Sequence, residues 1–215
     1  MVNIHQLYAP FLRHFRRGRL QRFYARFEVQ EATRVIDVGG DQFFWELAKE
    51  EGFPVPQVTV INLYENSTTL PENISWVVAD GKNIPFEDSA FDIAFSNSVI
   101  EHLETWENQV QFASEIQRVA PNFFVQTPSY NFPVEPHFLT PFIHWLPKSI
   151  QHKVVRNFTV WGLVTRPTAE YCKNMVSELR LLTQKEMAIL FPDSNLEIEQ
   201  SLGLEKSLLA IGKRK

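Results

Sequence analysis

The sequence has almost no cysteine, since Cys172 is its only one. A single cysteine cannot form an intrachain disulfide and cannot supply a cysteine-based zinc cluster. We therefore expect Cys172 to be a small buried apolar residue, and we predict no metal at the functional site.

Long apolar runs and a strong excess of one charge are also missing. No stretch approaches the roughly 20 apolar residues of a membrane helix, and no charged-then-apolar leader opens the chain. The 21 basic and 25 acidic side chains leave a formal charge of −4, which argues against nucleic acid as a partner. These features predict a cytoplasmic protein.

What the sequence does contain is a regular alternation of strand-like and helix-like segments. Its 215 residues suit a single domain, 1–215, and 44% of them are hydrophobic. The alternation predicts a parallel sheet with helices on both faces and a closing antiparallel hairpin. We expect strands at 34–38, 57–62, 74–79, 91–96 and 122–127, helices at 41–51, 104–119, 168–181 and 183–191, and hairpin strands at 196–201 and 207–211.

Two segments stand apart from this alternation. Residues 1–30 form an N-terminal helical segment, with a helix at 4–27 that Gly18 interrupts or kinks, and they are rich in arginine. This basic helix packs on the domain with its charges solvated, or it contacts anionic lipid or an anionic substrate. Residues 128–166 begin with a run of prolines and aromatic residues, and this composition predicts a cap inserted after the fifth strand.

The first predicted strand ends in Asp37, followed by Gly39 and Gly40. Glycines let the backbone approach a ligand closely, so a strand that ends this way favours a nucleotide-type pocket. The G-x-G-x-x-G pattern of dinucleotide sites is absent, and Asp41 would repel a phosphate. A nicotinamide oxidoreductase is therefore disfavoured, and a ligand with amine and hydroxyl donors is favoured. Asp41 alternatively serves only as a helix N-cap.

The next two strand ends carry further polar residues. Asn62 lies where a side chain that binds a ribose diol is expected, although it is alternatively a turn residue. Asp80 can accept from an exocyclic amine, and the backbone N–H of Gly81 can donate to a ring nitrogen. Together, the three strand ends predict an adenosine site without a phosphate cradle.

Several motifs carry a family resemblance: residues 35–40 (VIDVGG), 79–81 (ADG), 84–88 (IPFED), 91–103 (FDIAFSNSVIEHL) and 118–121 (RVAP). They resemble class I S-adenosylmethionine-dependent methyltransferases of the small stand-alone bacterial type, over roughly residues 34–127. The resemblance implies a Rossmann-like three-layer α/β sandwich with a mostly parallel seven-stranded sheet that ends in an antiparallel hairpin. It also implies S-adenosylmethionine as cofactor.

By this resemblance, the cofactor's amino-acid part lies beside the first strand end, its ribose and adenine follow the second and third, and its sulfonium lies near Ser96. The expected cofactor-binding residues are Asp37, Gly39, Gly40, Asp41, Asn62, Leu63, Asp80, Gly81, Lys82 and Ser96. Two positions depart from the family pattern, because Asp41 replaces a glycine and Asn62 replaces an acid. A non-catalytic relative that acts only through binding is therefore the alternative function.

The methyl acceptor is expected to be a small molecule or a lipid or sugar intermediate. If its nucleophile is a hydroxyl, a general base assists the transfer. The candidates are His102, which follows the fourth strand, and Glu135 and His137 in the proline-rich cap. Aromatic cap residues would form an apolar wall for the acceptor, or they only pack the cap onto the sheet.

Overall fold

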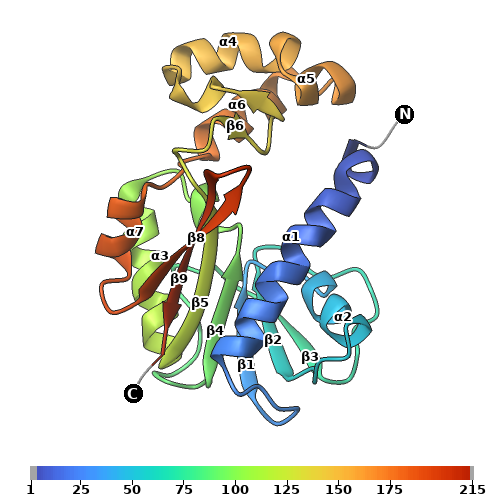
Figure 1. Ribbon diagram of the computed structural model, residues 1–215, viewed down its shortest axis with the longest axis vertical. Helices are drawn as coiled ribbons and strands as arrows, with labels where there is room; N and C mark the ends of the chain where they lie inside the picture. Colours follow the sequence, from blue (N-terminus) through green and yellow to red (C-terminus); the bar gives the residue numbers. More distant parts are fainter. Residues whose placement is uncertain (1–3, 214–215) are drawn as a thin grey trace.

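The computed structural model describes residues 4–213, with side chains from Arg13 onward. A single sheet of seven strands in the order β3-β2-β1-β4-β5-β9-β8 runs through the centre of the molecule (Figure 1). Strands β1 to β5 are parallel, and β9 joins β5 antiparallel and pairs with β8. The predicted Rossmann-like sheet with its closing antiparallel hairpin is thus confirmed.

The strand bounds are β1 Arg34–Val38, β2 Gln57–Asn62, β3 Ile74–Val78, β4 Ile93–Asn97, β5 Asn122–Pro128, β8 Asn195–Ser201 and β9 Leu204–Gly212. The helices that flank the sheet are α1 Ile4–Arg26, α2 Phe43–Glu50, α3 Trp106–Val119 and α7 Gln184–Leu190. A 3-10 turn, η1 Ile100–His102, follows β4. The connection between β2 and β3 contains no helix, as its length and Pro71 predict.

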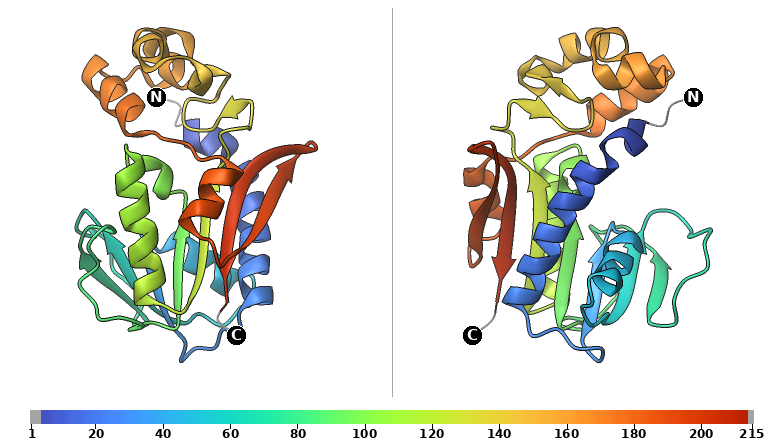
Figure 2. Two further views of the ribbon diagram at one scale, coloured as in Figure 1. Left: turned by 90° about the vertical axis from the view of Figure 1, so that its left-hand side faces the viewer. Right: turned by 45° about the vertical axis from the view of Figure 1, so that its right-hand side comes forward.

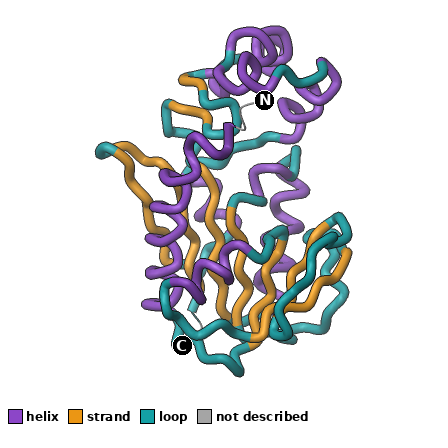
Figure 3. The backbone as a smooth tube through the Cα atoms, turned by 90° about the vertical axis from the view of Figure 1, so that its right-hand side faces the viewer, coloured by secondary structure: helices purple, strands orange, loops and turns teal. Residues whose placement is uncertain are grey.

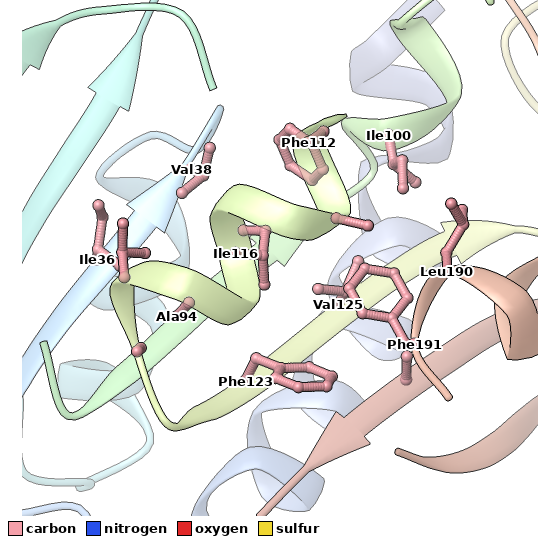
Figure 4. Close-up of a cluster of buried hydrophobic side chains, with 14 of the residues drawn as sticks. Ile36, Val38, Ala94, Ile100, Phe112, Ile116, Phe123, Val125, Leu190 and Phe191 are labelled. Atoms are coloured by element: carbon pink, nitrogen blue, oxygen red, sulfur yellow. The ribbon is translucent and has the colours of Figure 1, made fainter. Parts of the chain in front are cut away.

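Alternate residues of each buried strand face opposite helix layers, as the period of two in a strand requires. Ile36 and Val125 lie on the face covered by α3 and α7, where Phe112 and Phe191 complete a fully apolar cluster (Figure 4). On the other face Val35, Phe95 and Phe124 pack against Phe23 of α1 and Trp45 of α2. Burying both faces holds the strand ends in fixed positions at one edge.

The expected break at Gly18 is wrong, because α1 runs without interruption from Ile4 to Arg26. A Cβ at Gly18 would meet no atom of the described residues within 4 Å, so packing against those residues does not require a kink at this position. Buried Leu20 and Phe23 anchor the helix on the sheet. The expected apolar positions before Arg13 lie outside the described side chains.

The chain after β5 forms a cap over one end of the sheet (Figure 2). It consists of two-residue strands β6 Val134–Glu135 and β7 Thr140–Pro141, the turn η2 Ile143–Trp145, and helices α4 Lys148–Phe158, α5 Val160–Thr165 and α6 Ala169–Glu178. The cap has an apolar cluster of its own, in which Phe138 and Val155 meet Cys172 and Val176 of α6. It therefore extends through α6, beyond the expected limit at residue 166. Figure 3 shows this largely helical unit beyond the strands of the sheet.

No helix within residues 4–213 is long and apolar enough to cross a membrane.

Candidate functional site

Several buried side-chain polar atoms have no hydrogen-bond partner among the described residues, and three of these atoms lie where adjacent strands end. They are Oδ1 of Asp37 in β1, Oε1 of Glu101 in η1 after β4, and Nε2 of Gln126 in β5. A buried polar atom left unpaired costs about 1–3 kcal/mol, so such atoms call for a functional explanation. Three of them at neighbouring strand ends mark this edge, beneath the cap, as the candidate ligand site.

The loop after β1 packs tightly on Asp37. Gly39 has a φ of 77°, a backbone conformation that favours glycine, and its N–H donates to the carbonyl of Ile61 over 2.7 Å. A Cβ at Gly40 would lie 2.2 Å from Oδ1 of Asp37. Oδ2 of the same carboxyl accepts from Nε1 of Trp45 over 2.9 Å, so only Oδ1 is left for a ligand. Glycine is thus required at position 39 by the positive φ and at position 40 by the close approach of the Asp37 carboxyl group.

Burial raises the pKa of Asp37 to about 8; the nearby charge of Asp41 adds to the rise, and the Trp45 hydrogen bond opposes it. The carboxyl is therefore protonated at neutral pH in the folded chain, whereas it ionises near pH 4 when unfolded. A raised folded pKa contributes stability that is complete below the unfolded pKa and is lost as pH rises through 8.

This linkage predicts a pH dependence that Asp37→Asn removes. Between pH 5 and pH 8 the free energy of unfolding of the wild type should fall relative to that of Asp37→Asn, because only the wild type takes up a proton on folding. The asparagine carbonyl can still accept from Trp45. Urea unfolding of both proteins at four pH values measures the difference. A difference that stays constant across this range would contradict the protonated carboxyl.

The expected ribose and adenine residues lie at the ends of β2 and β3. Nδ2 of Asn62 donates to the carbonyl of Gly40 over 3.1 Å, which joins the second strand end to the glycine loop and leaves its oxygen free. Oδ1 of Asp80 accepts from the N–H of Lys82, and Oδ2 lies 3.2 Å from Nζ of that lysine. The Asp80 side chain is still 42% exposed, so it remains open to a further donor.

Gly81 and Leu63 complete this part of the edge. A Cβ at Gly81 would lie 2.8 Å from Val38 and 2.9 Å from Phe112, so only glycine fits there. Leu63 is exposed, and next to it Tyr64 is 75% exposed. The sequence interpretation missed Tyr64, although an aromatic residue directly after a strand end was a usable signal.

Two of the expected cofactor residues engage the protein's own backbone. The hydroxyl of Ser96 is fully buried and donates to the carbonyl of Val38 over 3.0 Å. Asp41 accepts from the N–H of Phe43 at the start of α2, the kind of contact that the N-cap alternative predicts, although Gln42 is the residue directly before the helix and makes no side-chain cap bond. Ser96 and Asp41 thus order the strand end and the helix start.

The three expected catalytic residues come together with Glu101, and we name these four residues the Glu–His cluster: Glu101, His102, Glu135 and His137. Ligating atoms of Glu101, His102 and His137 all lie within 4.8 Å of one another. Oε1 of Glu135 is 2.6 Å from Nδ1 of His137, and Oε2 of Glu101 accepts from the hydroxyl of Thr127 over 2.9 Å. The cluster joins the ends of β4 and β5 to the first hairpin of the cap.

Burial and charge set different protonation states within the cluster. Burial lowers the pKa of His102 to about 4, and the neighbouring His137 adds to the effect. Burial also opposes the charged form of His137, but Glu135 and Glu101 outweigh it and raise its pKa. Burial raises the pKa of Glu101 despite His137 and Thr127. His102 is therefore neutral at pH 7, whereas the two carboxylates favour the protonated form of His137.

A buried ionic network that the sequence interpretation missed ties α1 to the sheet beside this site. Nε and Nη2 of Arg19 donate to the two carboxylate oxygens of Glu199 over 3.1 and 2.7 Å, and Nη1 donates to Asn97 at the end of β4 over 2.9 Å. Nζ of Lys206 lies 3.1 Å from Glu199. The partners are up to 180 residues apart, so no local pattern identifies them.

Other arginines of the basic N-terminal helix also pair within the chain. Arg13 and Arg17 contact Glu50 and Glu51 at the C-terminal end of α2, and Arg26 contacts Glu197 on β8. This pairing favours a role for the charges in docking α1, while the predicted contact with anionic lipid stays a prediction.

Two surface depressions lie away from the edge beneath the cap. One of about 330 Å³ is lined by residues near the start of β4 and β5, including Asp92 and Asn122, and one of about 210 Å³ lies over the starts of β2 and β3. Neither contains a residue of the Glu–His cluster or of the glycine loop.

Comparison with known families and sequences gives an independent result. A family model described as a methyltransferase domain matches residues 36–122. Two uncharacterized proteins of Mycobacterium tuberculosis, from strains CDC 1551/Oshkosh and ATCC 25618/H37Rv, are each 37% identical over 54 residues. These matches cover 25% of this chain and span only 18% of the length of each relative.

Solved structures resemble the whole fold at low sequence identity. A 1,6-didemethyltoxoflavin-N1-methyltransferase of Burkholderia thailandensis, bound to S-adenosylhomocysteine, has a TM-score of 0.57 and 14% identity, over 93% of this chain and 78% of that one. An S-adenosylmethionine-dependent methyltransferase of Aquifex aeolicus has a TM-score of 0.51 and 16% identity, over 90% and 88%. A Rhodobacter sphaeroides protein described as a putative zinc-dependent alcohol dehydrogenase reaches 0.60 at 13% identity, over 87% and 86%. Such likenesses show the fold alone.

Proposed function

We propose that the chain is a class I S-adenosylmethionine-dependent methyltransferase, as the match of residues 36–122 to a methyltransferase-domain family supports, and that it transfers a methyl group to a hydroxyl of a small-molecule, lipid or sugar-type acceptor. The observation that carries this proposal is the row of unpartnered buried polar atoms at the ends of β1, β4 and β5. The first belongs to Asp37, against which the glycine loop (residues 39–40 after β1) packs, and the second belongs to Glu101 of the Glu–His cluster. The proposal assigns the loop to the cofactor and the cluster to the acceptor.

The glycine loop fits the amino-acid end of S-adenosylmethionine. Asp37 has one carboxyl oxygen without a partner among the described residues, and glycine at positions 39 and 40 lets Val99 and the Asp37 carboxyl pack against the loop backbone. Asn62 and Leu63 would flank the ribose, and Asp80 with Gly81 would bind the adenine. The two residues that depart from the family pattern are compatible with this assignment. Asn62 donates to the carbonyl of Gly40 in the loop, and Asp41 accepts from the N–H of Phe43 at the start of α2.

The bound cofactor would supply a methyl group that its sulfonium already activates. The chain's own task is then to hold the acceptor in line, to exclude water and to assist loss of the hydroxyl proton. The cap is suited to cover the acceptor, with Tyr130, Phe142 and Trp145 each partly exposed on it. Glu135 holds Nδ1 of His137, which leaves Nε2 as the ring nitrogen that acts on the acceptor, as a proton acceptor or through a bound cation.

A labelled-methyl experiment tests the proposed reaction. The protein is incubated with S-adenosylmethionine labelled in its methyl group and with fractions of a cell extract. We expect label in a low-molecular-weight or lipid fraction, and loss of that label when His137 is replaced by glutamine. Binding of S-adenosylhomocysteine without label transfer to any fraction would instead favour the non-catalytic alternative.

The adenine assignment predicts a measurable loss for one variant. Asp80→Ala should weaken binding of S-adenosylhomocysteine by about 1–3 kcal/mol, because a charged acceptor for the adenine amine is removed. Isothermal titration calorimetry measures the change. Asp88→Ala is the matched control, since Asp88 is in the same connection, is 80% exposed and pairs with Arg118. Equal affinities for wild type and Asp80→Ala would show that Asp80 does not meet the adenine.

A further inference from the structure

The Glu–His cluster contains the donor set of a metal site. Glu101, His102 and His137 each place one ligating atom within 4.8 Å of the other two. Two imidazoles and one carboxylate, with further positions left open, form a known protein set for zinc at catalytic sites. The three residues come from η1 and from the loop after β6, so the folded cap is required to assemble the set.

The surroundings of His137 are those of a metal ligand. A ligating histidine usually donates its second ring nitrogen to a carboxylate, which fixes the ring and its tautomer. Nδ1 of His137 makes this contact with Glu135 over 2.6 Å, and Oε2 of Glu135 is itself held by the N–H of Phe138 over 2.6 Å. Glu135 is 1% exposed, so this supporting contact is shielded from water.

Glu101 provides an independent indication of a ligand. Its side chain is fully buried, Thr127 holds one carboxylate oxygen, and the other oxygen, Oε1, has no partner among the described residues. The cluster therefore holds two buried carboxylates, Glu101 and Glu135, beside two imidazoles. A cation bound between these residues would give the unpartnered oxygen of Glu101 a ligand contact.

We propose that Glu101, His102 and His137 bind a divalent transition-metal ion, with zinc the best match to the donors. The sequence led us to expect no metal because Cys172 stands alone, but a histidine–glutamate site needs no cysteine. The role of the ion rests on the proposed function: an open coordination position takes the acceptor hydroxyl. Coordination lowers the pKa of that hydroxyl and its proton leaves to solvent. The oxygen then forms a bond to the methyl carbon as the carbon–sulfur bond breaks, and S-adenosylhomocysteine is released.

Cobalt is a direct probe of this site, because Co²⁺ in a site of low coordination number absorbs visible light. The full chain is treated with a chelator, freed of it, and titrated with Co²⁺ in the absence of cofactor and acceptor. We expect one equivalent to bind, with a visible band that one equivalent of Zn²⁺ removes. Glu101→Gln and His102→Ala should each weaken Co²⁺ binding at least tenfold, and Glu135→Gln about 10–100-fold. Circular dichroism establishes that each variant is folded.

His14→Ala is the matched control, because His14 is an exposed histidine outside the cluster, and its affinity for Co²⁺ should equal that of the wild type. A wild type without the visible band would overturn the proposal. So would a folded Glu101→Gln or His102→Ala that binds Co²⁺ as tightly as the wild type. Calorimetry of the metal-free chain with S-adenosylhomocysteine separates the two proposals, since cofactor binding without metal binding would remove only the metal site.

Discussion

Replacing Glu199 with glutamine should lower the free energy of unfolding by about 3–5 kcal/mol, the usual cost of leaving buried charges without their counter-ion. The Glu199 side chain is 4% exposed and balances Arg19 and Lys206, with Arg22 3.8 Å away. Burial works against its charged form, but Arg19 and Lys206 outweigh burial and lower the pKa of Glu199 to about 2. Urea denaturation at pH 7 measures the effect.

The partner Lys206 shows why removal of the carboxylate is costly. Burial, with a contribution from Arg19, lowers the pKa of Lys206 to about 8 even though Glu199 is present. Burial thus has the larger effect on the pKa of Lys206, whereas the ion pairs have the larger effect on the pKa of Glu199. Loss of Glu199 would leave Arg19 and Lys206 as two neighbouring buried cations that repel each other. Glu197→Gln is the control, since its partner Arg26 is half exposed, and it should cost less than 1 kcal/mol. Equal effects of the two variants would contradict the network.

The same network predicts that the free energy of unfolding falls at acid pH. The folded pKa of Glu199 is below its unfolded value, so its contribution is present above about pH 4.5 and is lost as pH falls towards 2. Glu199→Gln should therefore lose less stability than the wild type over that interval, in the same denaturation experiment.

Replacing Gly40 with alanine should weaken the binding of S-adenosylhomocysteine about tenfold to a hundredfold. The added Cβ would lie 2.2 to 2.3 Å from all three atoms of the Asp37 carboxyl group, which is buried and held by Trp45. The loop has to move, and overpacking of this kind costs about 1–3 kcal/mol. Calorimetry gives the affinity, and thermal unfolding checks that the variant folds.

Gly18→Ala is the matched control for this substitution. A Cβ at Gly18 meets nothing within 4 Å, and alanine favours a helix interior, so stability should rise slightly and affinity should not change. An affinity of Gly40→Ala equal to that of the wild type would mean that the loop does not contact the ligand.

The sheet could be predicted because its signal is local. The buried apolar runs of β1 and β2 lie at the expected residues 34–38 and 57–62, and Thr183 forms a capping box with Glu186 at the start of α7, within the expected helix at 183–191. The strand expected at 91–96 begins instead at Ile93. In the turn that leads into β4, the backbone N–H groups of Phe91 and Asp92 donate to the carbonyls of Val119 and Arg34, and the Asp92 carboxylate accepts from the N–H of Arg34.

The cap was harder to predict because its start has the composition of a loop. Helix α4 follows directly on Pro147, which occupies its N-cap without a side-chain hydrogen bond, so the sequence carries no clear start signal for it. The packing of Cys172 against Phe138 and Val155 is a tertiary feature. The sequence separation of these residues does not predict this packing.

The Glu–His cluster was partly predictable. His102, Glu135 and His137 were identified from their residue types and places, whereas Glu101 was seen only as a member of a motif. Its role depends on Thr127 and on the β6–β7 hairpin, which bring its carboxylate beside His137. The candidate cofactor residues were predicted from three separate strand ends, since a parallel sheet places such ends at one edge.

The central claim is that the edge formed by β1, β2 and β3 binds an adenosyl sulfur compound without a phosphate cradle. Calorimetric titration of the wild-type chain with S-adenosylhomocysteine, and separately with NADH, tests it most directly. The account predicts one S-adenosylhomocysteine bound per chain, with affinity reduced in Gly40→Ala, and no heat of binding with NADH. Binding of NADH with no response to S-adenosylhomocysteine would contradict it.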